Sequence, residues 1–164
     1  MKKNIMSRSF IIFISAMLMF VLAGCSNAKI KQNDNYVSSV KNLVNDTVNL
    51  NRTLKEQQEG FNCHDEEKSR QYISTMDSLA DGFQQILKLQ ATNEFDEYDK
   101  SLKTRAKACL QDITQLRSLT GYAVKNEDDT FYQNDKQDIF DKYKSECDAM
   151  REISSEIQTY WRNA

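Results

Sequence analysis

Apolar residues recur every three or four positions from Tyr36 onward, the spacing of helices with one buried face. Four helices are expected: one of about 24 residues from Tyr36, one from Asp65, one after a phase break at residues 91–93, and one ending near Trp161. The chain has no proline and four glycines, so little interrupts them. The pattern predicts an all-α fold, an antiparallel up-down-up-down four-helix bundle over residues 36–164.

Glycine and asparagine residues suggest where these helices end and begin. Gly60 and Gly121 stand where the first and third helices are expected to stop, as glycines do just past a helix. Gly82 lies beside the apolar stripe of the second helix and would let another helix approach closely. The start of the last helix stays open, because Asn126 and Asn134 both fit an N-cap position.

The first 25 residues follow a different pattern. The charged residues Lys2, Lys3 and Arg8 precede a run at residues 10–22 that is almost wholly apolar. A basic start followed by a short apolar run is typical of a secretory signal peptide. A permanent transmembrane helix is the less favoured alternative, because a spanning helix needs about 20 apolar residues.

Four residues close this apolar run: Leu22, Ala23, Gly24 and Cys25. They resemble the lipobox of bacterial lipoproteins. The resemblance implies that the Cys25 thiol is lipidated, with palmitate or similar acyl chains, and that residues 1–24 are removed as a signal peptide. The protein would then be anchored in the outer leaflet of the cell membrane, or in an outer membrane if the source has one. The alternative is an ordinary secretory signal with an incidental cysteine, and no family is recognised in the remaining sequence.

The composition of the mature part limits its partners. Residues 25–35 comprise the lipidated cysteine and a polar segment without apolar periodicity, which is expected to be a flexible tether. From Cys25 onward the net charge is −5, because the signal segment contributes +3 to a total of −2. Nucleic-acid binding requires a concentrated basic surface, so no nucleic-acid partner is expected. The lipid on Cys25 is expected to hold the acidic body at the membrane.

Cys109 and Cys147 are candidates for a disulfide bond. If the third helix ended near residue 120 and the fourth began near residue 135, the two cysteines would lie at one level of the bundle. If the fourth helix began at residue 127, they would be about 10 Å apart along the axis, too far to bridge. Two reduced thiols in the core are the alternative, since free cysteine is often buried.

No pattern in the sequence points to catalysis. Cys63 and His64 invite a metal site, but zinc usually takes four ligands and His64 is the one histidine, so both are expected to be solvated loop residues. The acidic runs at residues 65–67 and 127–129 fit helix N-termini better than a cation site. Glu-x-x-His pairs, a nucleophile elbow, a phosphate loop and the H-E-x-x-H pattern are all missing from the sequence. We therefore expect no enzyme, no cofactor and no metal.

Four aromatic residues in or beside two of the helix connections are the candidate partner-binding residues: Phe61, Tyr122, Phe131 and Tyr132. An even-numbered bundle places both connections at the end away from the lipid anchor. The aromatics either form a binding surface there or close the end of the core. We therefore expect a non-enzymatic surface lipoprotein that binds another cell-envelope protein through its membrane-distal loops. The alternative is a small-molecule or peptide receptor with a cavity between the helices. A third possibility is a bacteriophage-exclusion or toxin-immunity lipoprotein, which no feature of the sequence favours or opposes.

Overall fold

The structure is a computed structural model that describes the backbone of residues 5–164 and the side chains of residues 27–164. The chain divides into two compact units between Asn35 and Tyr36. Cys25 and the rest of the lipobox lie outside the residues whose side chains are described. Signal-peptide removal and lipidation therefore stay predictions.

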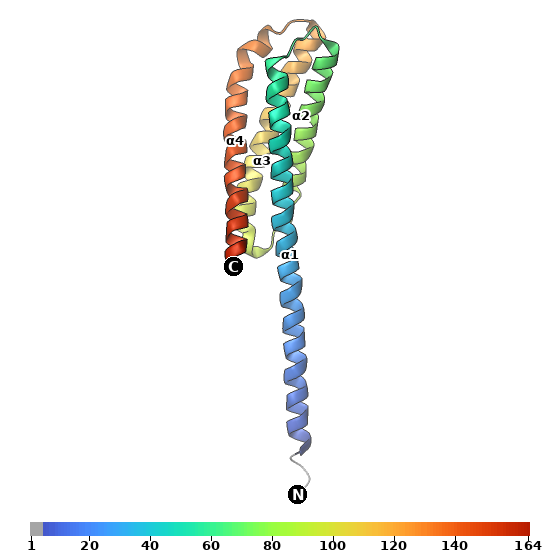
Figure 1. Cartoon of the computed structure of the whole chain (residues 1–164), viewed down its shortest axis with the longest axis vertical. Coiled ribbons are helices and arrows are strands. Elements are labelled where there is room, and N and C mark those ends of the chain that lie inside the picture. The colour runs from blue at the N-terminus through green and yellow to red at the C-terminus, as the bar shows by residue number, and fades with distance from the viewer. Residues whose placement is uncertain (1–4) are drawn as a thin grey trace. The chain divides into compact units, whose positions relative to one another are not determined.

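Residues 5–164 form four α-helices and one short 3-10 helix (Figure 1): α1 (Ile5–Glu59), α2 (Glu66–Leu87), η1 (Asn93–Phe95), α3 (Asp96–Asn126) and α4 (Thr130–Asn163). In the second unit, α1 from Tyr36 onward packs with α2, α3 and α4 as an antiparallel bundle, which confirms the predicted fold. The connections at residues 60–65 and 127–129 lie together at one end of the bundle, called the far end below (Figure 1). The α2–α3 connection and the C-terminus lie at the opposite end.

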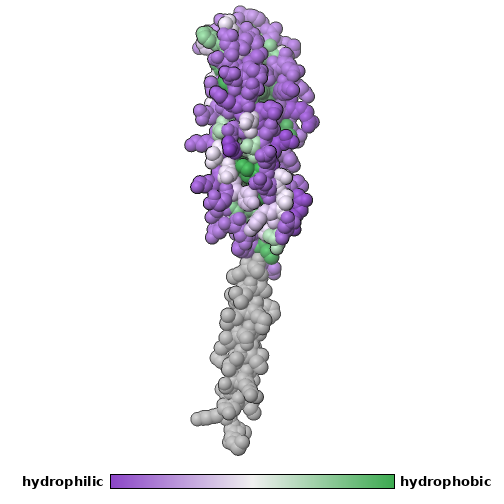
Figure 2. All heavy atoms as spheres, turned by 90° about the vertical axis from the view of Figure 1, so that its left-hand side faces the viewer, coloured by the Kyte–Doolittle hydropathy of each residue, from purple (hydrophilic) through white to green (hydrophobic). Residues whose placement is uncertain are grey.

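The apolar stripes of all four helices meet in one core. Its largest fully buried side chains come from every helix: Leu54, Tyr72, Met76, Leu79, Phe83, Ile86, Phe95, Leu102, Ile113, Leu116, Tyr132 and Met150. Gly82 has the predicted role, because a Cβ atom there would lie 3.3 Å from the Thr47 Cγ2 atom of α1. The surface on the α4 side is mainly hydrophilic, with small separate hydrophobic areas (Figure 2). This division between inside and outside is the one that the periodicity predicted.

The start of α2 and the break before α3 are also as predicted. Asp65 is the N-cap of α2, and its side chain accepts a hydrogen bond from the Lys68 amide at 3.1 Å. The helix stops at Leu87, and Thr92 precedes the 3-10 turn of η1. Phe95 at the end of that turn is fully buried and closes the core at this end.

The predicted end of the third helix at Gly121 is wrong. α3 continues to Asn126, and Glu127 takes the left-handed conformation after it, with φ of 50°. The apolar stripe explains the difference, because Thr120 and Ala123 are both fully buried and continue the core past Gly121. The burial of these two residues stabilises the fold by more than one glycine inside a helix destabilises it.

α4 begins at Thr130, between the two alternatives Asn126 and Asn134. The Asp128 carboxylate accepts hydrogen bonds from the Thr130 amide at 2.9 Å and the Thr130 hydroxyl at 2.6 Å. The Asp129 carboxylate accepts one from the Gln133 side chain at 2.8 Å. The acids of this turn therefore stabilise the beginning of α4, which agrees with the helix-terminus interpretation of residues 127–129.

Residues 26–35 were expected to be a flexible tether, but they lie within α1 and are helical. The segment contains neither glycine nor proline, and extending an existing helix avoids the cost of starting one. Within the part of the chain that the structure describes, no helix has an apolar stretch long enough to cross a membrane. The apolar run at residues 10–22 lies outside the residues whose side chains are described.

Gly121→Ala is expected to raise the free energy of unfolding by about 0.5–1 kcal/mol, because Gly121 is helical and alanine loses less backbone entropy on folding. A Cβ atom at Gly121 would have no neighbour within 4 Å. Gly82→Ala is the matched control, and its gain should be smaller because the new methyl group presses on buried Thr47. Urea denaturation followed by circular dichroism measures both; equal gains at the two sites would contradict this account.

Candidate functional site

The far end of the bundle is closed by three aromatic rings that pack at tilted or edge-to-face angles. Tyr72 and Tyr132 are fully buried, and their hydroxyl groups are 3.1 Å apart. The half-buried Phe61 ring packs against both, with centroid distances of 5.5 Å to Tyr72 and 4.5 Å to Tyr132. Burial raises the pKa of Tyr132 to about 12, so its hydroxyl stays neutral. Of the four candidate binding residues, Phe61 and Tyr132 therefore close the core.

The other two candidates form an exposed pair at the same end. Tyr122 on α3 is 49% exposed and Phe131 in the first turn of α4 is 55% exposed. Their rings meet edge to face, with centroids 5.8 Å apart. The acidic turn at residues 127–129 joins the two helices that carry them. We call Tyr122 and Phe131 the aromatic pair; both are among the exposed large hydrophobic residues that the structure describes.

Cys63 and His64 do not lie together in solvent as expected. His64 is exposed, but Cys63 is buried and belongs to the core. A thiol is small and weakly polar, so it can pack below the connection without a hydrogen-bonding partner. Among the residues that the structure describes, no group of three or more histidine, cysteine or acidic side chains is arranged to hold a metal ion.

Cys109 and Cys147 lie at one level of the bundle, with their sulfur atoms 3.6 Å apart. Cys109 is 17 residues before the end of α3, and Cys147 is 17 residues after the start of α4. The third helix is longer than predicted, and a turn of three residues follows it. These two features bring the cysteines to the same level, although the helix boundaries differ from the predicted ones. Both cysteines are buried free thiols here, so the disulfide stays a prediction.

A groove between α1 and α4 runs beside Cys147. Its volume is about 230 Å³, and its lining is largely apolar, with Val48, Phe140 and Tyr143 among the lining residues. Its charged lining residues are the four cations Arg52, Lys55, Lys144 and Arg151 and one carboxylate, Asp148. The groove is therefore basic, although the protein as a whole is acidic.

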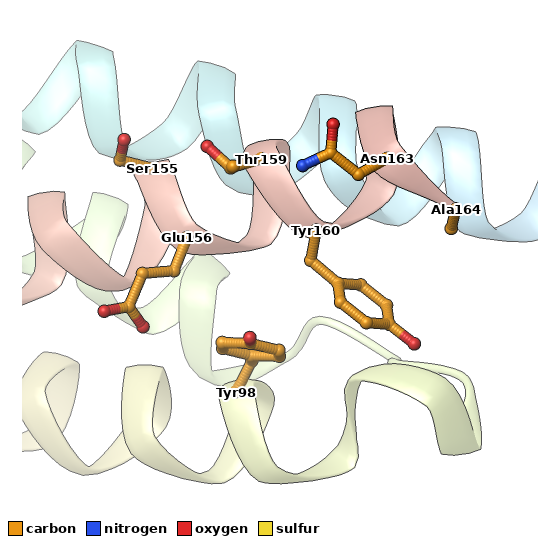
Figure 3. A pocket seen from close by; sticks show the side chains of 7 residues that line it. All are labelled: Tyr98, Ser155, Glu156, Thr159, Tyr160, Asn163 and Ala164. Atoms are coloured by element: carbon orange, nitrogen blue, oxygen red, sulfur yellow. The ribbon is translucent and has the colours of Figure 1, made fainter.

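A second, shallower depression of about 620 Å³ lies near the C-terminus (Figure 3). Tyr98 on α3 and Tyr160 on α4 project into the space between their helices, and Glu156 lies on the same side. Ser155, Thr159 and Asn163 extend from the other side of α4 (Figure 3). These polar groups do not converge on one point, so the depression has no arrangement for acid–base or nucleophilic chemistry.

Asn51 is the site residue that the sequence interpretation missed. Its amide nitrogen donates a hydrogen bond to Cys147 Sγ at 3.4 Å, and its amide oxygen accepts one from the Tyr143 hydroxyl. Asn51 lies in the apolar stripe of its helix, between Val44 and Leu54. A polar amide in a core position was the available signal, because such a group needs a hydrogen-bonding partner. The partners of the Asn51 amide, Tyr143 and Cys147, are on α4, and the sequence pattern of α1 does not identify them.

No protein-family model, curated protein or solved structure matches this chain.

Proposed function

We propose that this protein is a non-enzymatic binding module of the bacterial cell envelope, held to a membrane by lipid on Cys25. Its aromatic pair, Tyr122 and Phe131, contacts another envelope protein. The lipobox-like residues 22–25 support the anchor, and the exposed aromatic pair supports the binding surface. Tyr36 is the first residue of the bundle unit, and its ring lies 5.3 Å from that of Phe95, at the end opposite to the pair. This position supports an arrangement in which the aromatic pair faces away from the lipid.

The exposure of the aromatic pair is the observation that carries this proposal. Two large rings about half exposed on adjacent helices offer apolar area that a partner can cover, and aromatic residues often supply much of the binding free energy. The acids of residues 127–129 lie between them in the chain, so a partner with an apolar pocket and basic groups fits best.

Crosslinking on intact cells tests the proposal. The double variant Tyr122→Ser/Phe131→Ser is expected to lower the yield of a specific crosslinked partner at least about tenfold, the loss typical of interface hot spots. Tyr160→Ser is the matched control, because Tyr160 is 43% exposed at the opposite end, and it should keep the yield within about twofold. Unchanged capture by the double variant, or capture of lipid-processing enzymes alone by the wild type, would contradict the proposal.

The groove between α1 and α4 supports the second candidate function, a receptor for a small molecule or peptide. It is apolar and basic, which suits a ligand with negative charge. At about 230 Å³ it is smaller than most drug-sized ligand sites, which span about 300–1,000 Å³. A ligand of the groove would therefore be smaller than a typical drug molecule.

A further inference from the structure

The two thiols beside the groove differ in access. Cys109 is fully buried, with the Met150 sulfur 3.8 Å from its own. Cys147 is 7% exposed and is one of the residues that line the groove. A molecule in the groove would therefore meet Cys147 first, with Cys109 behind it at 3.6 Å.

The surroundings also give the two thiols different reactivity. The Asn51 amide donates to Cys147 Sγ, and the Tyr143 hydroxyl holds that amide in place from its other side. The hydrogen bonds from Cys109 and from the Asn51 amide lower the pKa of Cys147, against burial, which raises it. The hydrogen bond to Cys147, together with burial, raises the pKa of Cys109. The thiolate is the attacking form in thiol–disulfide exchange, so the accessible thiol is also the one that loses its proton more readily.

The charges around the groove select the ligand. Asp148 is already paired with Lys144 at 2.8 Å and with Arg151 at 3.5 Å. Arg52 and Lys55 make no ion pair with any carboxylate that the structure describes, and both are exposed. The groove therefore has uncompensated positive charge, which raises the local concentration of small anions.

We propose that Cys147 and Cys109 form a thiol–disulfide exchange site, in which Cys147 attacks a small disulfide that carries carboxylates and is bound in the groove. The reaction oxidises the protein's own two thiols once, without turnover, so it goes beyond the proposed binding function but does not make the protein an enzyme. It does not depend on the aromatic pair or on the lipid anchor.

The reaction has two balanced steps. The Cys147 thiolate attacks one sulfur of the small disulfide, so that a Cys147 mixed disulfide forms and one small thiolate leaves and takes up a proton. Cys109 then loses its proton and attacks Cys147 Sγ, which forms the Cys109–Cys147 bond and releases the second small thiol. Two protein thiols are oxidised and one small disulfide is reduced to two thiols. The sulfur atoms must approach from 3.6 Å to the length of an S–S bond, about 2.05 Å.

Trapping of the mixed disulfide tests the assignment of the two thiols. The reduced full chain is treated with 3,3′-dithiodipropionate, a small disulfide with two carboxylates, then alkylated and mapped by mass spectrometry. The wild type should gain the Cys109–Cys147 bond, Cys109→Ala should keep one mercaptopropionate on Cys147, and Cys147→Ala should form neither product. Cys63→Ala is the control and should behave as the wild type. Mercaptopropionate on Cys109 in Cys147→Ala, or a reaction of Cys147 no faster than that of Cys63, would overturn the proposal.

A charge-reversal experiment leaves both cysteines in place and tests the groove itself. Arg52→Glu/Lys55→Glu should slow the reaction with 3,3′-dithiodipropionate about tenfold at low ionic strength, the lower end of electrostatic effects on association rates. The same variant should not slow the reaction with cystamine, a cationic disulfide. Lys41→Glu/Lys125→Glu is the matched control, with the same change in net charge at two exposed lysines outside the groove lining. Equal slowing by both double variants would overturn the groove as the binding site.

Discussion

Cys25→Ala is expected to abolish incorporation of a clickable palmitate analogue into this protein when the full chain is expressed in a bacterium. The lipobox resemblance of residues 22–25 assigns the lipid to this one thiol. Each buried methylene contributes about 0.8 kcal/mol to membrane binding, so two long chains hold a protein far more firmly than one. No other change of a single residue should alter the protein's attachment as much.

The labelling experiment has a direct control in the same chain. Cys63→Ala should keep the label, because Cys63 is a core thiol of the bundle. Intact mass should also show that the wild type lacks residues 1–24, whereas Cys25→Ala should not yield this lipidated product. An unlabelled wild type, or label that persists in Cys25→Ala, would refute the lipoprotein assignment and would leave the ordinary secretory signal as the better interpretation.

Phe83→Ala is expected to lower the free energy of unfolding by about 3–5 kcal/mol, the range for truncating a buried aromatic ring. Phe83 is fully buried on α2, and its ring meets that of Tyr143 on α4 edge to face at 6.0 Å. The contact crosses the bundle, so a cavity there removes packing from two helices together. Urea denaturation followed by circular dichroism measures the loss.

The matched control for this prediction is Phe131→Ala, which removes the same ring from a site that is 55% exposed. Its effect on the free energy of unfolding should stay within about 0.5 kcal/mol, as is usual for surface positions. Similar losses for the two variants would mean that Phe131 packs as a core residue, and the proposed binding surface would then lose its main support.

The helical periodicity was sufficient to predict the four-helix bundle. Apolar positions three and four apart, with little glycine and no proline, leave few other ways to bury the stripes. Predictions that depend on the chemistry of a single residue were also correct. Asp65 is an N-cap because its carboxylate satisfies a free amide of the first turn, and Gly82 gives room because it has no side chain.

The errors arose where a local preference competed with packing. Gly121 alone is typical of a helix end, but the burial of Thr120 and Ala123 favours continuation of the helix past it. Cys63 was expected in a solvated loop because too few metal ligands accompany it and His64, yet Cys63 is buried in the core beneath the connection. In both cases the burial of nearby residues, which depends on other helices, outweighed the local pattern.

The candidate site was predicted only in part, because its residues come from separate helices. Tyr122 and Phe131 were identified with Phe61 and Tyr132, but aromatic character alone could not separate the exposed rings from the buried ones. Only the packing of the far end decides that, because Tyr132 turns inward on α4 while Phe131, one residue earlier, turns outward.

The sequence by itself determined the helical class, the position of the core stripes and the predicted lipid anchor, because each depends on residues close together in the chain. The tertiary structure decided the register of α3 against α4, and with it the 3.6 Å separation of the Cys109 and Cys147 sulfur atoms. It also decided that Asn51 of α1 meets Cys147 of α4 beside a basic groove. Contacts between distant segments depend on where each helix begins and ends, and those points are set by packing across the bundle.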